Sequence, residues 1–331
     1  MSKSDWDSAL GQLLGANKIY AVVEHEACLD YDLINSDRIP HIIYNQPKPV
    51  TPLKMFFLPI KQNVSNLEAQ NKQIIIGAPN CDVEALRILD EIYLEEPFTD
   101  PFYKQRRENT LIISFDCLDI LEHCHCNSYG IDPFASEIAD LSIILLENQA
   151  VLTSLGKKGD AFIKTLSSLE GTSLNDYPND AIIEEKHSAT IQKLKKSNNT
   201  LPGYKESGML VSRSNGEIWK KYASDCVSCG ACSAICPTCS CFLLNDKPAF
   251  EKVRQIDTCQ YPGFERVAGG EDALGNLATR FRNRYMCKYV WKPETFEALA
   301  CTGCGRCIET CIGGINKNEL IIELEKETMS R

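Results

Sequence analysis

Two cysteine runs with the same spacing constrain this 331-residue chain more than any other feature. Both follow the pattern C-x2-C-x2-C-x3-C, the first at Cys226, Cys229, Cys232 and Cys236 and the second at Cys301, Cys304, Cys307 and Cys311. In bacterial ferredoxins such a run places three thiolates around one [4Fe–4S] cube, while its fourth cysteine ligates the other cube. The paired runs therefore predict two clusters.

The ferredoxin pattern also assigns ligands to each cluster. The first cluster would be held by Cys226, Cys229, Cys232 and Cys311, and the second by Cys236, Cys301, Cys304 and Cys307. A structural zinc site usually pairs two C-x2-C units around one ion, so it cannot easily use eight cysteines in this order. Gly230 and Gly305, at matching positions, are expected to let the backbone approach the cluster sulfides closely.

The runs depart from the ferredoxin pattern in two respects. Ferredoxins keep their runs close together, whereas here 64 residues separate Cys236 from Cys301. The second run also lacks the proline that follows Cys236 in the first, a change that bears on hydrogen bonding to the cluster and so on its potential. Further cysteines lie in the insert: Cys239, Cys241 and Cys259 either pack around the clusters or ligate further metal, whereas Cys287, like Cys28, is expected to be structural.

Composition narrows the class of protein. Seventeen cysteines are too few for a disulfide scaffold in a chain of this length, and thiols clustered in a reducing cytosol more often bind metal. No apolar run reaches the ~18–20 residues of a membrane span, and no export signal is evident, so a cytoplasmic protein is predicted. The net charge of −10 argues against nucleic acid as a partner. The basic stretch from Thr279 to Lys292 is either a solvated helix face or a basic surface beside an anionic cofactor or docking subunit.

The N-terminal half has the pattern of a mixed α/β domain. A buried strand is predicted from Lys72, followed by an amphipathic helix for which Asp82 would be the N-cap. A second strand is predicted at 109–115, a β-hairpin at 141–155 and a helix from Asp160. The predicted fold is therefore α+β, with a mixed α/β domain at 1–175, a polar linker with one helix at 176–210, and a largely helical, ferredoxin-like dicluster domain at 211–331.

Several segments resemble one known family. The chain resembles the iron–sulfur β-subunit of cytoplasmic NiFe hydrogenases (sulfhydrogenases), a 4Fe-4S dicluster family related to the corresponding subunit of anaerobic sulfite reductase. The resemblance covers about residues 70 to 311 and is carried, in order, by "GAPNCDVEALRILDEIYL", "FYKQRREN", "CHCNSYG", "CVSCGACSAICPTCSCF", "DTCQYPGFERVAGG", "TRFRNRYMCK" and "CTGCGRC". It implies a protein that carries electrons between a flavoprotein and a catalytic subunit.

The resemblance further implies a third [4Fe–4S] cluster, held by Cys81, Cys117, Cys124 and Cys126. The residues themselves support this in part, because Cys81 and Cys117 each follow a predicted strand. If those strands are neighbours, both thiols emerge at one sheet edge, beside the loop that carries the other two. Two alternatives stay open: His123 or His125 replaces a thiolate, or some of these are ordinary buried cysteines.

Motifs for catalysis are missing from the sequence. It has no dinucleotide-binding G-x-G-x-x-G after a strand, no P-loop and no H-E-x-x-H, so catalysis is expected on partner chains. We expect a non-catalytic electron-transfer subunit of a soluble anaerobic hetero-oligomer, working between a NiFe hydrogenase-like subunit on one side and a flavin- and NAD(P)-binding subunit on the other. The alternatives are the corresponding subunit of a sulfite reductase-type complex, a module of another flavin-based oxidoreductase, or a zinc-stabilised scaffold.

Overall fold

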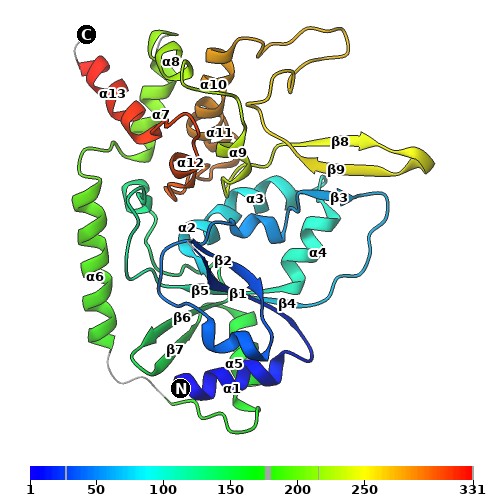
Figure 1. Ribbon diagram of the computed structural model, residues 1–331, viewed down its shortest axis with the longest axis vertical. Coiled ribbons are helices and arrows are strands. Elements are labelled where there is room, and N and C mark those ends of the chain that lie inside the picture. Colours follow the sequence, from blue (N-terminus) through cyan, green and yellow to red (C-terminus); the bar gives the residue numbers. More distant parts are fainter. Residues whose placement is uncertain (27, 176–179, 215, 330–331) are drawn as a thin grey trace.

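The computed structural model describes residues 1–26, 28–175, 180–214 and 216–329. Residues 176–179, with which the predicted linker begins, lie outside this range. In Figure 1 a sheet with its helices forms the lower part and the C-terminal helices form the upper part, while α6 (Asp180–Ser197) runs along one side between them. The predicted order of a mixed α/β region followed by a largely helical region is confirmed.

The described N-terminal residues form a six-stranded sheet with the order β2-β1-β4-β5-β6-β7. The central strands β1, β4, β5 and β6 are parallel, and the edge strands β2 and β7 are antiparallel to their neighbours. The strands are β1 (Lys18–His25), β2 (Cys28–Leu33), β4 (Gln73–Pro79), β5 (Thr110–Phe115), β6 (Leu141–Leu146) and β7 (Gln149–Ser154). The predicted strands from Lys72 and at 109–115, and the hairpin at 141–155, are confirmed.

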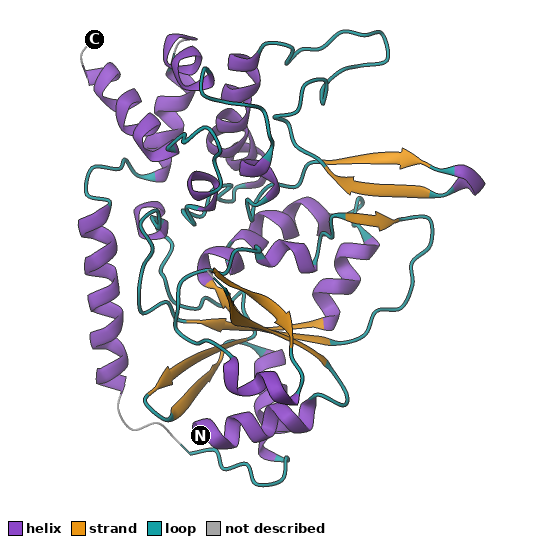
Figure 2. Ribbon diagram, viewed as in Figure 1, coloured by secondary structure: helices purple, strands orange, loops and turns teal. Residues whose placement is uncertain are grey.

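Helices cover both faces of this sheet (Figure 2). Successive side chains of a strand point to opposite faces, so Ile74 and Ile76 of β4 pack in one core with Trp6, whereas Ile75 packs in another with Leu86. The first core lies under α1 (Lys3–Leu13) and α5 (Lys157–Ser167), and the second under α2 (Asn80–Val83), α3 (Ala85–Leu94) and α4 (Pro101–Asn109). The result is a three-layer α/β/α arrangement.

One expectation within this region is wrong. Asp82 is not the N-cap of the predicted helix, because it lies inside α2, whose N-cap is Pro79. Its carboxylate instead accepts hydrogen bonds from the Leu53 amide and from the Arg306 guanidinium, far along the chain. The Asp82 carboxylate therefore pairs with a residue distant in sequence and does not cap the helix, contrary to what the local sequence pattern predicted.

The C-terminal helices pack around a separate core that includes Trp219, Phe281, Tyr285 and Leu320. They are α7 (Tyr204–Arg213), α8 (Gly216–Ala223), α9 (Ala231–Ala234), α10 (Leu277–Met286), a π-helical turn (Cys287–Trp291), α11 (Lys292–Phe296), α12 (Arg306–Glu309) and α13 (Lys317–Met329). Short 3-10 helices occur at Ser36–His41, Leu53–Phe56, Cys126–Tyr129 and Pro248–Phe250. Because α7 begins at Tyr204, the stretch predicted as a linker with one helix also contains the start of a second.

The insert between the cysteine runs contains a β-hairpin that joins the two halves of the protein. Strands β8 (Phe242–Asp246) and β9 (Lys252–Ile256) pair, and β9 also pairs with β3 (Lys61–Asn63) from the N-terminal half. This three-stranded sheet projects to one side in Figure 1. It was not predicted, because "FLLND" and "KVRQI" lack the apolar alternation of a half-buried strand.

None of the helices in the described ranges combines the length and the apolar character that crossing a bilayer would require.

Candidate metal centres

Strand pairing brings the four N-terminal cysteines together. Cys81 follows β4 and Cys117 follows β5, and these two strands are parallel neighbours. Their carboxyl ends therefore meet at one edge of the sheet, where open α/β sheets commonly bind ligands. Cys81, Cys117, Cys124 and Cys126 line one cavity, together with Gly303 and Cys304 of the second run. The N-terminal thiols thus meet one another and the C-terminal region.

Burial makes these thiols hard to ionise on their own. It raises the pKa of Cys81 and of Cys117 well above the usual value, and that of Cys126 to about 12. A coordinating metal deprotonates a thiol outright. A bound metal group would therefore supply the positive charge that stabilises these buried cysteines as thiolates. The Nζ of Lys48 lies 3.8 Å from the Sγ of Cys124. The donor set and its surroundings fit an iron–sulfur cluster.

His125 is already engaged elsewhere. Its Nδ1 lies 2.8 Å from the backbone oxygen of His123, and its Nε2 lies 2.9 Å from the Nζ of Lys317. The ring is fully buried, and burial together with the Lys317 charge holds its pKa well below the usual value. The neutral ring therefore donates from Nδ1 and accepts at Nε2, so both nitrogens already have hydrogen-bond partners.

The cysteines predicted to hold the first C-terminal cluster also share a cavity. Cys226, Cys229, Cys232 and Cys311 line it, as do Cys307 and Arg284. The Nη2 of Arg284 donates to the Cys232 carbonyl at 3.1 Å, but within the described residues its buried Nε has no acceptor. An unsatisfied buried donor costs about 1–3 kcal/mol. Cluster sulfides or ligand sulfurs would accept this hydrogen, so the cavity fits a [4Fe–4S] group.

The second predicted ligand set lies between the other two. Cys304 lines the N-terminal cavity, whereas Cys307 lines the first C-terminal cavity. Cys236 and Cys301 are buried, and the Nζ of Lys288 donates to the Sγ of Cys236 at 3.0 Å. Burial alone would lower the pKa of Lys288, but the charges of Cys236 and Cys239 raise it well above the usual value. A buried cation thus faces the thiols directly.

The basic stretch from Thr279 to Lys292 is not a solvated face. Arg280, Arg284 and Lys288 are all buried, and the last two contact residues of the first cysteine run. The alternative of a basic surface beside an anionic cofactor is also wrong in part, because these cations lie inside the protein. Their helix, α10 with its π-helical continuation, lays positive charge against thiols that would carry negative charge.

The remaining cysteines occupy distinct places. Cys241 directly precedes β8 and Cys259 follows β9, so both lie at the open end of the β8–β9 hairpin. Cys28 is exposed and Cys287 is partly buried. Across the described ranges, no three Cys, His, Asp or Glu side chains already converge around a single metal ion. A cubane needs sulfurs spaced more widely, because irons and sulfides stand between its ligands.

Comparison with known proteins identifies the chain at the level of family. Residues 225–315 match the family described as a 4Fe-4S dicluster domain. Over 328 residues the chain is 31% identical to sulfhydrogenase 2 subunit beta of Pyrococcus furiosus, an alignment that covers 95% of this chain and 94% of the relative. The chain belongs to the sulfhydrogenase β-subunit family. The resemblance seen in the sequence is thereby confirmed, and the dicluster match implies two [4Fe–4S] clusters. No solved structure matches.

In the present protein a buried ion pair, which the sequence did not reveal, holds the two halves together. Both nitrogens at the tip of Arg306 donate to the Asp82 carboxylate, and Nε donates to the Pro49 carbonyl at 3.0 Å. Arg306 is 1% exposed and Asp82 is not exposed at all. Because Arg306 lies between Cys304 and Cys307, the pair fixes the second run against the N-terminal sheet edge.

Glycines in the second run allow this close approach. A Cβ at Gly303 would lie 2.6 Å from the Cys126 backbone, and one at Gly305 would lie 2.4 Å from the His123 carbonyl oxygen. Both residues also have the positive φ that favours glycine. Gly230 likewise has no room for a Cβ, because Thr258 and Tyr261 crowd it. Gly230 and Gly305 were expected to let the backbone approach the cluster sulfides; in the structure these two glycines and Gly303 allow close packing between segments of the chain.

The Gly303→Ala variant is expected to separate the second run from the N-terminal thiols. The new Cβ would overlap the Cys126 backbone, so the cost exceeds the roughly 1–2 kcal/mol of a left-handed alanine alone. Gly314→Ala is the matched control, because its φ is +66° and nothing lies within 4 Å of the added atom. Anaerobic denaturant titration would compare both variants. Equal destabilisation would contradict the close packing at Gly303.

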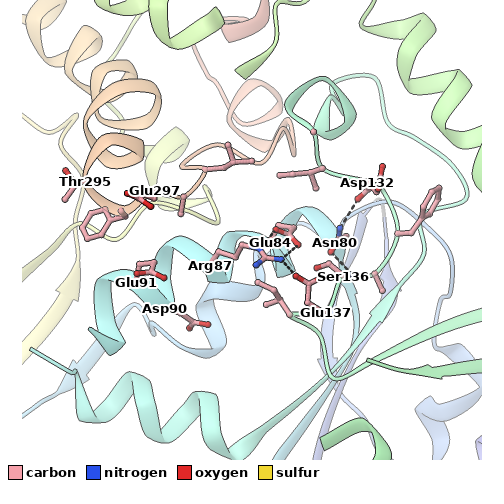
Figure 3. A pocket seen from close by; sticks show the side chains of 18 of the residues that line it. Asn80, Glu84, Arg87, Asp90, Glu91, Asp132, Ser136, Glu137, Thr295 and Glu297 are labelled. Carbon is pink, nitrogen blue, oxygen red and sulfur yellow. Dashed lines mark hydrogen bonds and ion pairs between the residues drawn. The ribbon is translucent and has the colours of Figure 1, made fainter. Parts of the chain in front are cut away.

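A cleft of about 1210 Å³ lies beside α3. Figure 3 shows its carboxylates, which include Glu91, Asp132 and Glu297, around the lone labelled guanidinium of Arg87. Arg87 is itself held by Glu84 and Glu137. Such a lining repels the phosphates of flavin and nicotinamide nucleotides, so the cleft is poorly suited to those cofactors.

Proposed function

We propose that this chain is the electron-transfer subunit of a soluble, cytoplasmic hetero-oligomer and does no catalysis itself. It would relay electrons through iron–sulfur clusters between a NiFe hydrogenase-like catalytic subunit on one side and a flavin- and NAD(P)-binding subunit on the other. The observation that carries this proposal is that the second ligand set contributes one cysteine to the wall of each of the other two cavities. Cys304 lines the N-terminal thiol cavity and Cys307 lines the first C-terminal cavity, which supports three redox centres in series.

The proposed ligands follow the sequence assignment. The first cluster is held by Cys226, Cys229, Cys232 and Cys311, the second by Cys236, Cys301, Cys304 and Cys307, and the third by Cys81, Cys117, Cys124 and Cys126. When bound, these groups supply reversible one-electron transfer. The protein holds them in low-polarity surroundings and sets their charge environment through buried lysine and arginine side chains. The exposed thiol of Cys229 brings the first centre nearest to solvent.

The assignment of flavin chemistry to another chain rests on charge as well. The cleft beside α3 presents carboxylates to any ligand, and the sequence contains no glycine-rich dinucleotide motif. The 31% sequence identity with a sulfhydrogenase β-subunit, which extends over 95% of this chain, favours a hydrogenase partner over a sirohaem-containing one. Anaerobic affinity purification from the native host would test this, since a sirohaem subunit in place of a NiFe subunit would overturn the assignment.

Iron and acid-labile sulfide analysis of anaerobically purified protein tests the cluster content. Three [4Fe–4S] clusters predict about twelve irons per chain. The Cys124→Ser variant is expected to lose about four of them, while Cys28→Ser, at an exposed thiol, is expected to lose none. An unchanged iron content in Cys124→Ser would mean that the N-terminal cysteines are ordinary buried thiols and hold no cluster. Zinc without sulfide would overturn the whole proposal.

A further inference from the structure

The buried cations near the thiols divide into two groups by their partners. At the N-terminal cavity each charge is balanced: Lys48 pairs with Glu309 at 2.8 Å, Asp119 pairs with Lys193 at 3.0 Å, and Arg306 pairs with Asp82. These ion pairs leave little net charge around Cys81, Cys117, Cys124 and Cys126.

The cations around Cys236 are not balanced in this way. Within the described residues Lys54, Lys288 and Lys292 form no ion pair with any carboxylate. Lys54 donates to the Ser233 and Cys239 carbonyls, and Lys292 donates to the Thr238 carbonyl and to the Ser240 hydroxyl. Burial lowers the pKa of Lys54, and the charges of Cys239 and Cys236 act against that shift.

Lys288 makes the direct contact with a predicted ligand. It is 3% exposed, and its Nζ donates to the Cys236 sulfur at 3.0 Å, to the Thr238 hydroxyl at 2.8 Å and to the Ala300 carbonyl at 3.1 Å. All three ammonium protons are therefore used, and one of them lies on the sulfur. The side chain is fixed in place as a charged hydrogen-bond donor to the second ligand set.

Net charge and hydrogen bonds to sulfur set the reduction potential of an iron–sulfur cluster. Reduction adds a negative charge, so an uncompensated cation nearby stabilises the reduced form and raises the potential. Burial acts in the opposite direction and is greater at the second site: Cys236, Cys301 and Cys304 are buried, whereas of the N-terminal four cysteines only Cys126 is buried and the others are partly buried. The uncompensated ammonium groups therefore have to outweigh this difference in burial.

We propose that Lys288, supported by Lys54 and Lys292, raises the reduction potential at the Cys236, Cys301, Cys304 and Cys307 site above that at the N-terminal thiols. Lys288 is then a positioning residue that makes the middle site of the series the preferred resting place for an electron. This inference rests on the proposed function, since it requires that both cysteine sets hold clusters.

Potentiometric titration followed by electron paramagnetic resonance tests it on the full chain. In the unmodified protein the signal that Lys288→Met alters should appear at a higher potential than the signal that Cys124→Ser abolishes. Lys288→Met should shift one reduction equilibrium at least tenfold toward the oxidised form, which is 59 mV for a one-electron couple. Lys288→Arg keeps the charge and should restore most of the shift. Lys158→Met, at an exposed lysine that contacts β5, should shift nothing.

The two proposals fail in different ways. Protein that binds no iron at these cysteines would overturn the proposed function. If Lys288→Met keeps its full iron content but every potential is unchanged, the role of Lys288 is wrong. If Lys288→Met fails to assemble, Lys54→Met provides the second variant, with a smaller shift in the same direction expected. The inference would also be overturned if, in the unmodified protein, the second site has a lower reduction potential than the N-terminal site.

Discussion

The Asp82→Ala variant is expected to lower the free energy of unfolding by about 3–5 kcal/mol, because it leaves a buried guanidinium without its counter-charge. Arg306 would keep only the backbone carbonyls of Pro49 and Val50 as acceptors. The Leu53 amide would also lose its acceptor, the Asp82 Oδ2 at 2.9 Å. Anaerobic denaturant titration, with intrinsic tryptophan fluorescence as the signal, would measure the loss.

Two further variants separate the buried charge from general damage. The double variant Asp82→Ala with Arg306→Met removes both charges and should recover much of the stability, as replaced buried pairs often do. Arg87→Met breaks a pair whose arginine side chain is 45% exposed, so it should cost only about 0–1 kcal/mol. If Asp82→Ala costs no more than Arg87→Met, the pair does not fasten the two halves together.

The second large effect is expected from Cys226→Ser. Loss of a thiolate ligand should remove about four irons per chain and bleach part of the cluster absorbance. It should also weaken the C-terminal helices, because metal binding at such a site is coupled to folding. Arg284 lines the same cavity and would keep its buried Nε without an acceptor.

Hydrogen exchange shows where the damage falls. In Cys226→Ser, protection should decrease in α8 and α10, whose residues pack in the core next to Cys226, while β4 and β5 keep theirs. Cys28→Ser is the matched control, since that thiol is exposed on β2. Full iron content in Cys226→Ser would contradict the ligand assignment, and a uniform loss of protection would contradict the local role of the cluster.

Local patterns in the sequence were sufficient for four strands of the sheet, β4 to β7, but not for β1 and β2. The run "KQIIIGA" is apolar throughout because β4 is buried on both faces between parallel neighbours. The neighbourhood of Cys81 and Cys117 followed from two strands ending at one edge. The ferredoxin spacing needs no long-range information, because three of its thiols lie within one short loop.

Long-range pairing accounts for what the sequence did not predict. Nothing near Asp82 indicates that its partner is Arg306, and nothing in "KQN" indicates that β3 pairs with β9 across the chain. The same holds for Lys288, which lies in a stretch with the basic composition of a solvated surface but is buried. Burial depends on which helix faces which cavity, and that is decided by tertiary packing rather than by local composition.

The contact between Gly303 and the Cys126 backbone also bears on how such a protein is assembled in the cell. The cavity that holds Cys81 and Cys117 receives part of its wall from Gly303 and Cys304, which leave the ribosome long after the N-terminal strands. A nascent chain therefore exposes the thiols of Cys81, Cys117, Cys124 and Cys126 to oxygen and to stray metal until Gly303 and Cys304 have been synthesised. If this cavity holds the proposed third cluster, its loading has to wait until the second cysteine run has been synthesised, so scaffold proteins that deliver clusters would have to act after that point.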